Sequence, residues 1–159
     1  MVGIIDSFLE PVAREVFGTM ANLAIENVAA AGTAPAPNAF ELRGISGCIG
    51  FGGRMTGTLF FSVPEKLATQ MAHTILGDMC AIGEREVSDA IGELTNMLAG
   101  GCKSRLCDQG YPVAISIPNI IRGESIRAAG KNITFTLDRV FRIPELDDTV
   151  RIIVIGKFD

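Results

Sequence analysis

The sequence of 159 residues contains few of the side chains that usually bind metals. It has one histidine, His73, and four cysteines, Cys48, Cys80, Cys102 and Cys107, none of which forms a Cys-x-x-Cys pair. These side chains are too few and too scattered to indicate a zinc site. We therefore expect no metal site in this chain, and we expect the cysteines to be small buried hydrophobic residues of a protein in a reducing cytoplasm.

Long hydrophobic runs and clusters of basic residues are also absent. No stretch approaches the roughly 18 uninterrupted apolar residues of a membrane span. The N-terminal segment has no basic region and reaches Asp6 and Glu10 early, unlike a secretory signal. The net charge is −4, without a long basic run. We therefore expect a cytoplasmic protein whose partners include neither nucleic acid nor a membrane.

The patterns that are present predict a single α+β domain over residues 1–159. Helical periodicity alternates with short apolar runs bounded by glycine and proline. We predict a mostly antiparallel sheet of about six strands packed against two or three helices. The predicted helices are 4–22, 64–76 and 84–108, and the predicted strands are 40–51, 55–63, 113–117, 120–128, 131–142 and 150–158.

Segments between these elements are rich in glycine and proline. Residues 25–31 fit either a continuation of the first helix or a short strand, and residues 34–37 read Ala-Pro-Ala-Pro, a loop signal. The glycines between positions 44 and 57 lead into a strand and lack a following Gly-Lys-Ser/Thr. We interpret them as bulges and a tight turn, not as a phosphate-binding loop. His73 is expected at the edge of the second helix, without a catalytic role.

The segment 86–106 is the most regular helical pattern in the chain. Its apolar residues recur at steps of three and four and form one stripe: Val87, Ala90, Ile91, Leu94, Met97, Leu98, Cys102 and Leu106. The opposite face carries a row that we call the ridge, consisting of Asp89, Glu93, Asn96 and Gly100. Gly92 and Lys103 flank this ridge.

Glycines within this helix are costly, at roughly 1 kcal/mol each relative to alanine. Gly92 and Gly100 lie on or beside the ridge, where we expect no core packing to require a small residue. A low helix face that lets another protein surface approach closely would explain both glycines.

The string Asp89-x-x-x-Glu93-x-x-Asn96, followed later by Pro118, resembles the signature of the CheC/CheX/FliY family of CheY phosphatases. That signature is Asp or Ser, then Glu four residues on, then Asn three further on, and a more distant Pro. A single copy of the motif in a chain of this size is most similar to the CheX branch. The resemblance extends from the first helix to the last strand.

The resemblance implies a CheC/CheX-like fold and a phosphatase that acts on the aspartyl phosphate of a CheY-type response regulator. Asn96 would enter the regulator's active site and orient the attacking water, and Glu93 would pair with the regulator's lysine. Asp89 would support docking, Lys103 would lie at the same interface, and Pro118 would shape the strand start beside the helix. The chain would need no cofactor of its own, because the regulator would supply Mg²⁺. A carboxamide suits the role because it donates and accepts hydrogen bonds without titrating near neutral pH.

Two other interpretations of the ridge remain open. A non-catalytic module of the same fold would bind a response regulator or a flagellar-switch component without hydrolysis, although the intact Asn96 favours the enzyme. Alternatively, the ridge is the solvated face of a helix in a structural homo-oligomer, since such short patterns are common. The resemblance also implies a homodimer joined through sheet strands, and the apolar run 151–158 is our candidate edge strand.

A weak internal repeat relates the first and third predicted helices. An overlay at an offset of 78 residues places Glu15 on Glu93 but Gly18 on Asn96. If the chain arose by duplication, only the later helix keeps the carboxamide.

Overall fold

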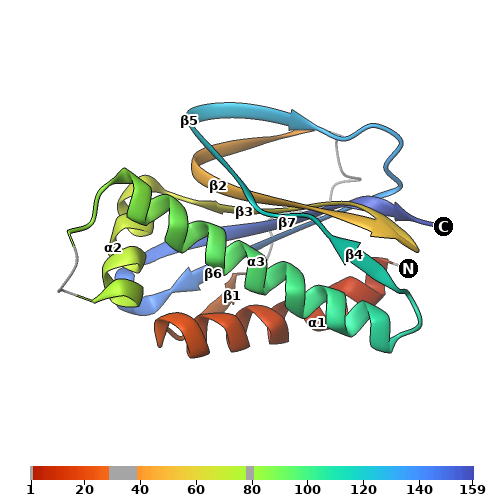
Figure 1. Cartoon of the computed structure of the whole chain (residues 1–159), viewed down its shortest axis with the longest axis horizontal. Coiled ribbons are helices and arrows are strands. Elements are labelled where there is room, and N and C mark those ends of the chain that lie inside the picture. Colours follow the sequence, from red (N-terminus) through yellow and green to blue (C-terminus); the bar gives the residue numbers. More distant parts are fainter. Residues whose placement is uncertain (1, 29–38, 78–80) are drawn as a thin grey trace.

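The computed structural model of the chain describes residues 2–28, 39–77 and 81–159. Within these ranges it contains a seven-stranded sheet with three α-helices on one face (Figure 1). The strand order is β1-β6-β7-β3-β2-β4, and β5 also pairs with β2. Every pairing is antiparallel. The predicted α+β class is therefore confirmed.

The helices lie close to their predicted ranges. α1 spans Val2–Val16 and continues as a π-helical turn, Phe17–Ala21; α2 spans Glu65–Leu76, and α3 spans Glu84–Asp108. The segment after the first helix, which the sequence left open, forms the three-residue strand β1, Glu26–Val28, and this strand brings the sheet to seven. The predicted loop at residues 34–37 lies outside the described residues.

The remaining strands follow the predicted pattern of apolar runs. They are β2 (Ala39–Gly53), β3 (Met55–Val63), β4 (Val113–Ile115), β5 (Asn119–Ala129), β6 (Phe135–Ile143) and β7 (Asp148–Phe158). β6 begins four residues later than predicted, because the chain bends before it, with Asn132 in the left-handed region at φ 57°. Two of the glycines occupy a bulge and a turn, as predicted. Gly44 (φ 75°) lies at a register shift between β2 and β5, and Gly53 (φ 127°) lies at the turn into β3.

One main hydrophobic core lies between the helices and the sheet. The predicted apolar stripe of α3 belongs to it, and only Met97 of the stripe is half-buried and not fully buried. Ile152 and Val154 of β7 point into this core, whereas Ile153 and Ile155 belong to a smaller cluster on the other face of the sheet. Burial of the stripe turns the ridge of α3 away from the sheet.

The run 151–158 is not an edge strand. β7 is hydrogen-bonded to β3 on one side and to β6 on the other. Its continuous apolar character reflects burial on both faces of the sheet, so the prediction that it joins a dimer as an exposed edge is wrong. The outer strands of the described sheet are β1 at one end and β4 with β5 at the other.

Close packing of α1 against α3 depends on Gly101. A Cβ added at this position would lie 2.6 Å from Val12 Cγ1, so a larger residue requires the Val12 side chain or the first helix to move. Among the described residues, no helix is long and apolar enough to cross a bilayer.

Candidate functional site

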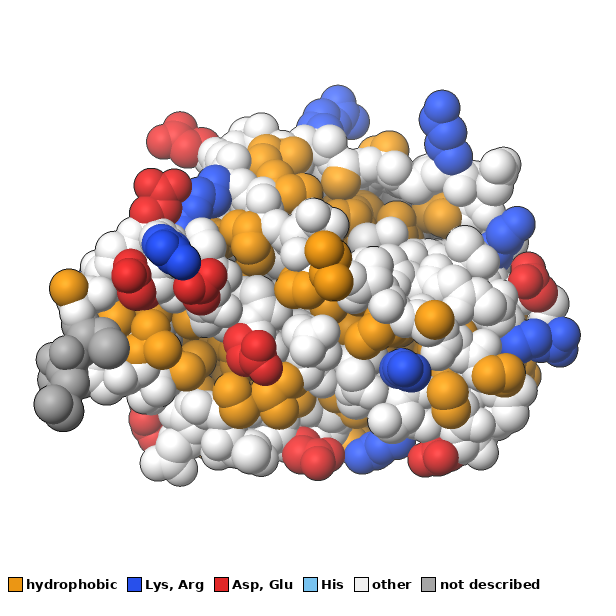
Figure 2. Space-filling model, in the orientation of Figure 1, with side chains coloured by type: hydrophobic (Ala, Val, Ile, Leu, Met, Phe, Trp, Pro, Cys, Tyr) orange, Lys and Arg blue, Asp and Glu red, His pale blue; other side chains and the backbone are white. Residues whose placement is uncertain are grey.

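The ridge of α3 lies at the surface of the molecule. Asp89, Glu93 and Asn96 are exposed, and within the described ranges none of these three side chains has a hydrogen bond or an ion pair. Hydrophobic side chains gather on the face that carries α3, with acidic and basic residues scattered between them (Figure 2). A carboxylate and a carboxamide that are neighbours on one helix face are thus available to a second molecule.

The back of α3 is held against β2 at the turn that bears Asn96. The adjacent Thr95 is fully buried, and its hydroxyl donates to the carbonyl oxygen of Ile91 at 2.6 Å. Thr95 packs onto Gly47 of β2, where an added Cβ would lie 2.7 Å from Thr95 Cβ. Only glycine leaves room at this point, so the helix sits close to the sheet and Asn96 is presented from a fixed turn. The prediction that Gly47 is a bulge or turn glycine did not include this contact, because no local pattern reveals a helix packing across a strand.

The two glycines beside the ridge have different surroundings. Gly92 is buried, and an added Cβ would lie 3.7 Å from Ile120 Cδ1 and 4.0 Å from Pro118 Cγ. Alanine would fit there in ordinary contact with both side chains, so Gly92 packs against the start of β5, contrary to the expectation of an open face. At Gly100 an added Cβ would meet nothing within 4 Å, and the helix face is open as predicted.

The other predicted contact residues lie near the same face. Lys103 is exposed on α3, beyond the turn of Gly100. Pro118 directly precedes β5, at the start of the strand that runs beside the helix. The structure therefore brings the motif residues of α3 and the proline together on one side of the molecule.

Arg122 ties the N-terminal end of α3 to β5. Its guanidinium pairs with Glu65 Oε1 at 3.0 Å and donates to the carbonyl oxygen of Glu84 and to Ser88 Oγ, both at 2.8 Å. These contacts join the first turns of α2 and α3 to the edge strand. They keep β5 alongside the helix that carries the ridge.

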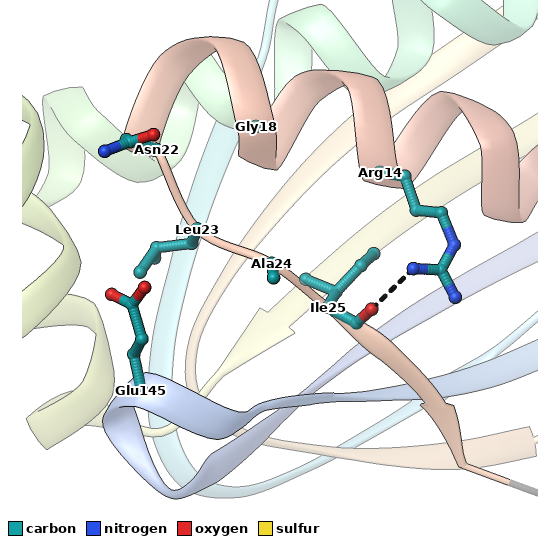
Figure 3. Close-up of a pocket in the computed structure, with 7 residues that line it drawn as sticks. All are labelled: Arg14, Gly18, Asn22, Leu23, Ala24, Ile25 and Glu145. Atoms are coloured by element: carbon teal, nitrogen blue, oxygen red, sulfur yellow. Dashed lines mark hydrogen bonds between the residues drawn. The ribbon is translucent and has the colours of Figure 1, made fainter.

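A pocket of about 420 Å³ lies elsewhere, between the end of α1 and the connection of β6 to β7 (Figure 3). Arg14 in this pocket is already engaged, since its guanidinium donates to the carbonyl oxygen of Ile25 at 2.7 Å and pairs with Glu10 at 2.6 Å. Gly18 also lines the pocket, and it occupies the position that the helix overlay assigns to Asn96. None of the predicted site residues lies in this pocket.

The cysteines and His73 form no catalytic arrangement among the described residues. Burial raises the pKa of Cys48 to about 11 and that of Cys102 to about 12, so both thiols are protonated at neutral pH. Cys107 is exposed, which corrects the expectation of burial: it follows buried Leu106 by one residue and is rotated about 100° away from the core. Cys80 lies outside the described residues.

The expected position of His73 is confirmed, because it lies exposed in the last turn of α2. Within the described ranges, no group of three or more His, Cys, Asp or Glu residues is placed to hold a metal ion.

Several solved structures of chemotaxis proteins share this fold. CheX from Desulfovibrio desulfuricans is 18% identical, with a TM-score of 0.83 over 98% of this chain and 99% of that chain. A chemotactic CheC-like protein from Shewanella oneidensis MR-1 is 26% identical, with a TM-score of 0.78 over 99% and 100% of the two chains. A chain in the CheX–CheY–BeF₃–Mg²⁺ complex from Borrelia burgdorferi is 17% identical, with a TM-score of 0.71 over 95% and 96%. No curated protein matches the sequence.

The sequence also matches a protein family directly. The family described as chemotaxis phosphatase CheX matches residues 45–137. This range is more than half of the chain, and it contains the whole ridge of α3, Pro118 and all of β5. The chain therefore belongs to the CheX family of chemotaxis phosphatases.

Proposed function

We propose that this protein hydrolyses the aspartyl phosphate of a CheY-type response regulator. The observation that carries the proposal is the exposed pair Glu93 and Asn96 on the helix of a CheX-family chain, since neither side chain has a partner among the residues that the structure describes. A chain of the same fold occurs in a complex with CheY, BeF₃ and Mg²⁺, which supports a response regulator as the partner.

The chemistry of the reaction explains why one carboxamide is enough. An acyl phosphate is already reactive, and its hydrolysis requires a water molecule placed in line with the phosphorus atom. Asn96 Oδ1 accepts a hydrogen bond from that water, which fixes the oxygen lone pair toward the phosphorus. The gain comes from positioning a reactant that is otherwise free in solution.

The neighbouring residues act in docking. Glu93 pairs with the lysine of the regulator's active site, and Asp89 and Lys103 contact the regulator at the two ends of the ridge. Gly100 leaves the helix face low, so that the regulator's surface comes close enough for Asn96 to enter. Mg²⁺ comes with the regulator, and this chain contributes no metal ligand.

Reversing the charge of Glu93 is expected to lower kcat/KM by about tenfold to a hundredfold, because a lysine-to-lysine repulsion replaces an attractive pair at a contact that excludes water. The experiment follows the decay of a phosphorylated CheY-type regulator with Mg²⁺, in the presence of wild-type protein or of Glu93→Lys. Glu145→Lys is the matched control, since Glu145 is also exposed but lies in the connection of β6 to β7.

Wild-type protein must accelerate the decay for the proposal to stand. If it binds several phosphorylated regulators without accelerating the decay of any, the protein is a binding module of this fold. Equal rates for Glu93→Lys and Glu145→Lys would remove Glu93 from the interface.

We also propose that the protein is a homodimer joined through strands at an edge of the sheet. With β7 in the interior, the described strands available for such pairing are β1, β4 and β5. Size-exclusion chromatography with light scattering should give twice the chain mass of 16.9 kDa. A single species at the chain mass over a wide concentration range would contradict the dimer.

A further inference from the structure

One large hydrophobic side chain is far more exposed than the others. Ile117 is 79% exposed, whereas the next two such residues in the described ranges, Leu76 and Val28, are 39% and 36% exposed. A single exposed isoleucine is common on protein surfaces and by itself indicates nothing. Ile117 stands out because of how its backbone is held and where it lies.

The backbone beside Ile117 is fixed and not part of a free loop. The Ser116 N–H donates to the carbonyl oxygen of Gly50 at 3.0 Å, and the Gly50 N–H donates to Ser116 Oγ at 2.9 Å. The same hydroxyl donates to the carbonyl oxygen of Ile117 at 3.0 Å. Pro118 follows and restricts the chain further. The isoleucine is therefore presented from a rigid position.

This segment is a β-bulge between β4 and β5 on the edge of β2. Phe51 of β2 faces Ile115, and Cys48 faces Asn119, so three steps along β2 correspond to four along the edge. The extra residue interrupts the alternation of side chains, and Pro118 has no N–H to donate to β2. Bulges of this kind redirect a side chain and are common beside functional sites.

The bulge lies near the turn of α3 that runs from Gly92 to Asn96. β5 runs antiparallel to the helix: Arg122 contacts its first turns, and Ile120 and Pro118 pack at Gly92. An extended chain advances about 3.3 Å per residue and a helix about 1.5 Å, so Ile117, one residue before Pro118, corresponds to a position about two residues beyond Gly92 along the helix. That position lies in the turn that ends at Asn96.

We propose that Ile117 is an apolar anchor that contacts the response regulator beside its phosphorylated aspartate. The partner surface is an apolar or aromatic side chain at the rim of the regulator's active site. The inference rests on the proposed function. It gives the bulge an apolar contact with the regulator, in addition to the polar contacts made by the ridge. Burial of an isoleucine on a rigid support adds affinity without the cost of ordering a loop. Ile117 thus raises the affinity for the regulator and does not act on the water.

The test separates binding from turnover. Ile117→Ser is expected to raise KM for the phosphorylated regulator, and Kd for the BeF₃⁻- and Mg²⁺-treated regulator, by about tenfold with kcat unchanged. Ile117→Val should remain close to wild type. Leu76→Ser is the control for the loss of an exposed apolar side chain, because Leu76 is the last residue of α2 and lies neither on the ridge nor on an edge strand. The melting temperature and the oligomeric mass should be the same in all variants.

Unchanged KM and Kd for Ile117→Ser, with an active wild type, would overturn the anchor and leave the phosphatase intact. Weaker binding by Ile117→Ser, with a wild type that binds but does not hydrolyse, would support the anchor and overturn the phosphatase. A change in oligomeric mass in Ile117→Ser would assign the residue to contacts between copies of this chain, and failure of the wild type to bind would overturn both proposals.

Discussion

Asn96→Ala is expected to slow hydrolysis of the phosphorylated regulator by roughly 10²–10³-fold while leaving its binding nearly unchanged. The side chain is exposed and has no partner within the described ranges, so its removal costs the fold less than about 0.5 kcal/mol. The lost rate reflects the water that is no longer held in line with the phosphorus. Single-turnover decay of the phosphorylated regulator at saturating protein measures this step directly.

Two variants sharpen the test of Asn96. Asn96→Asp keeps the shape but loses the donor and adds a negative charge next to the phosphoryl group, so it should be as slow as alanine. Gln109→Ala removes an exposed carboxamide from the end of the same helix and should leave the rate unchanged. A full rate for Asn96→Ala at saturation would show that the water is oriented by another group.

Gly47→Ala is expected to destabilise the protein by about 1–3 kcal/mol, although it adds only one methyl group. The new Cβ overlaps Thr95 Oγ1 and lies 2.7 Å from Thr95 Cβ, and Thr95 is fully buried. Relief requires α3 to move away from β2 at the turn that carries Asn96. We therefore expect a lower phosphatase rate at temperatures where the variant is still folded. Urea denaturation gives the free energy of unfolding.

A double-mutant cycle locates the cause of this effect. Thr95→Ala removes the hydroxyl and the methyl group nearest to residue 47, so Gly47→Ala with Thr95→Ala should cost less than the sum of the single changes, by about 0.5 kcal/mol or more. Gly100→Ala is the contrasting control, because an added Cβ there meets nothing and alanine favours the helix by up to about 1 kcal/mol. Strictly additive free energies would show that the overlap with Thr95 is not the source of the loss.

Local sequence patterns are sufficient for most of the secondary structure. The α3 stripe from Val87 to Leu106 is buried as its spacing predicts, and Gly52-Gly53 ends the long strand β2 as turn residues should. These features depend on the geometry of one helix or one hairpin, which the order of residues specifies directly. The three-residue β1 was not decided, since its pairing partner β6 lies more than a hundred residues away.

The order of residues specifies which side chains share the exposed face of α3, because the helical period alone brings Asp89, Glu93 and Asn96 into one row. In contrast, the interior position of β7, the packing of Thr95 on Gly47 and the bulge that presents Ile117 beside the ridge are visible only in the folded chain. Each of these depends on contacts between segments far apart in the chain. An apolar run has the same local sequence pattern in an edge strand and in an interior strand, and a glycine has the same pattern at a turn and beneath a helix. The strand pairing and helix packing that distinguish these cases join residues far apart in the chain, so no short sequence pattern reveals them.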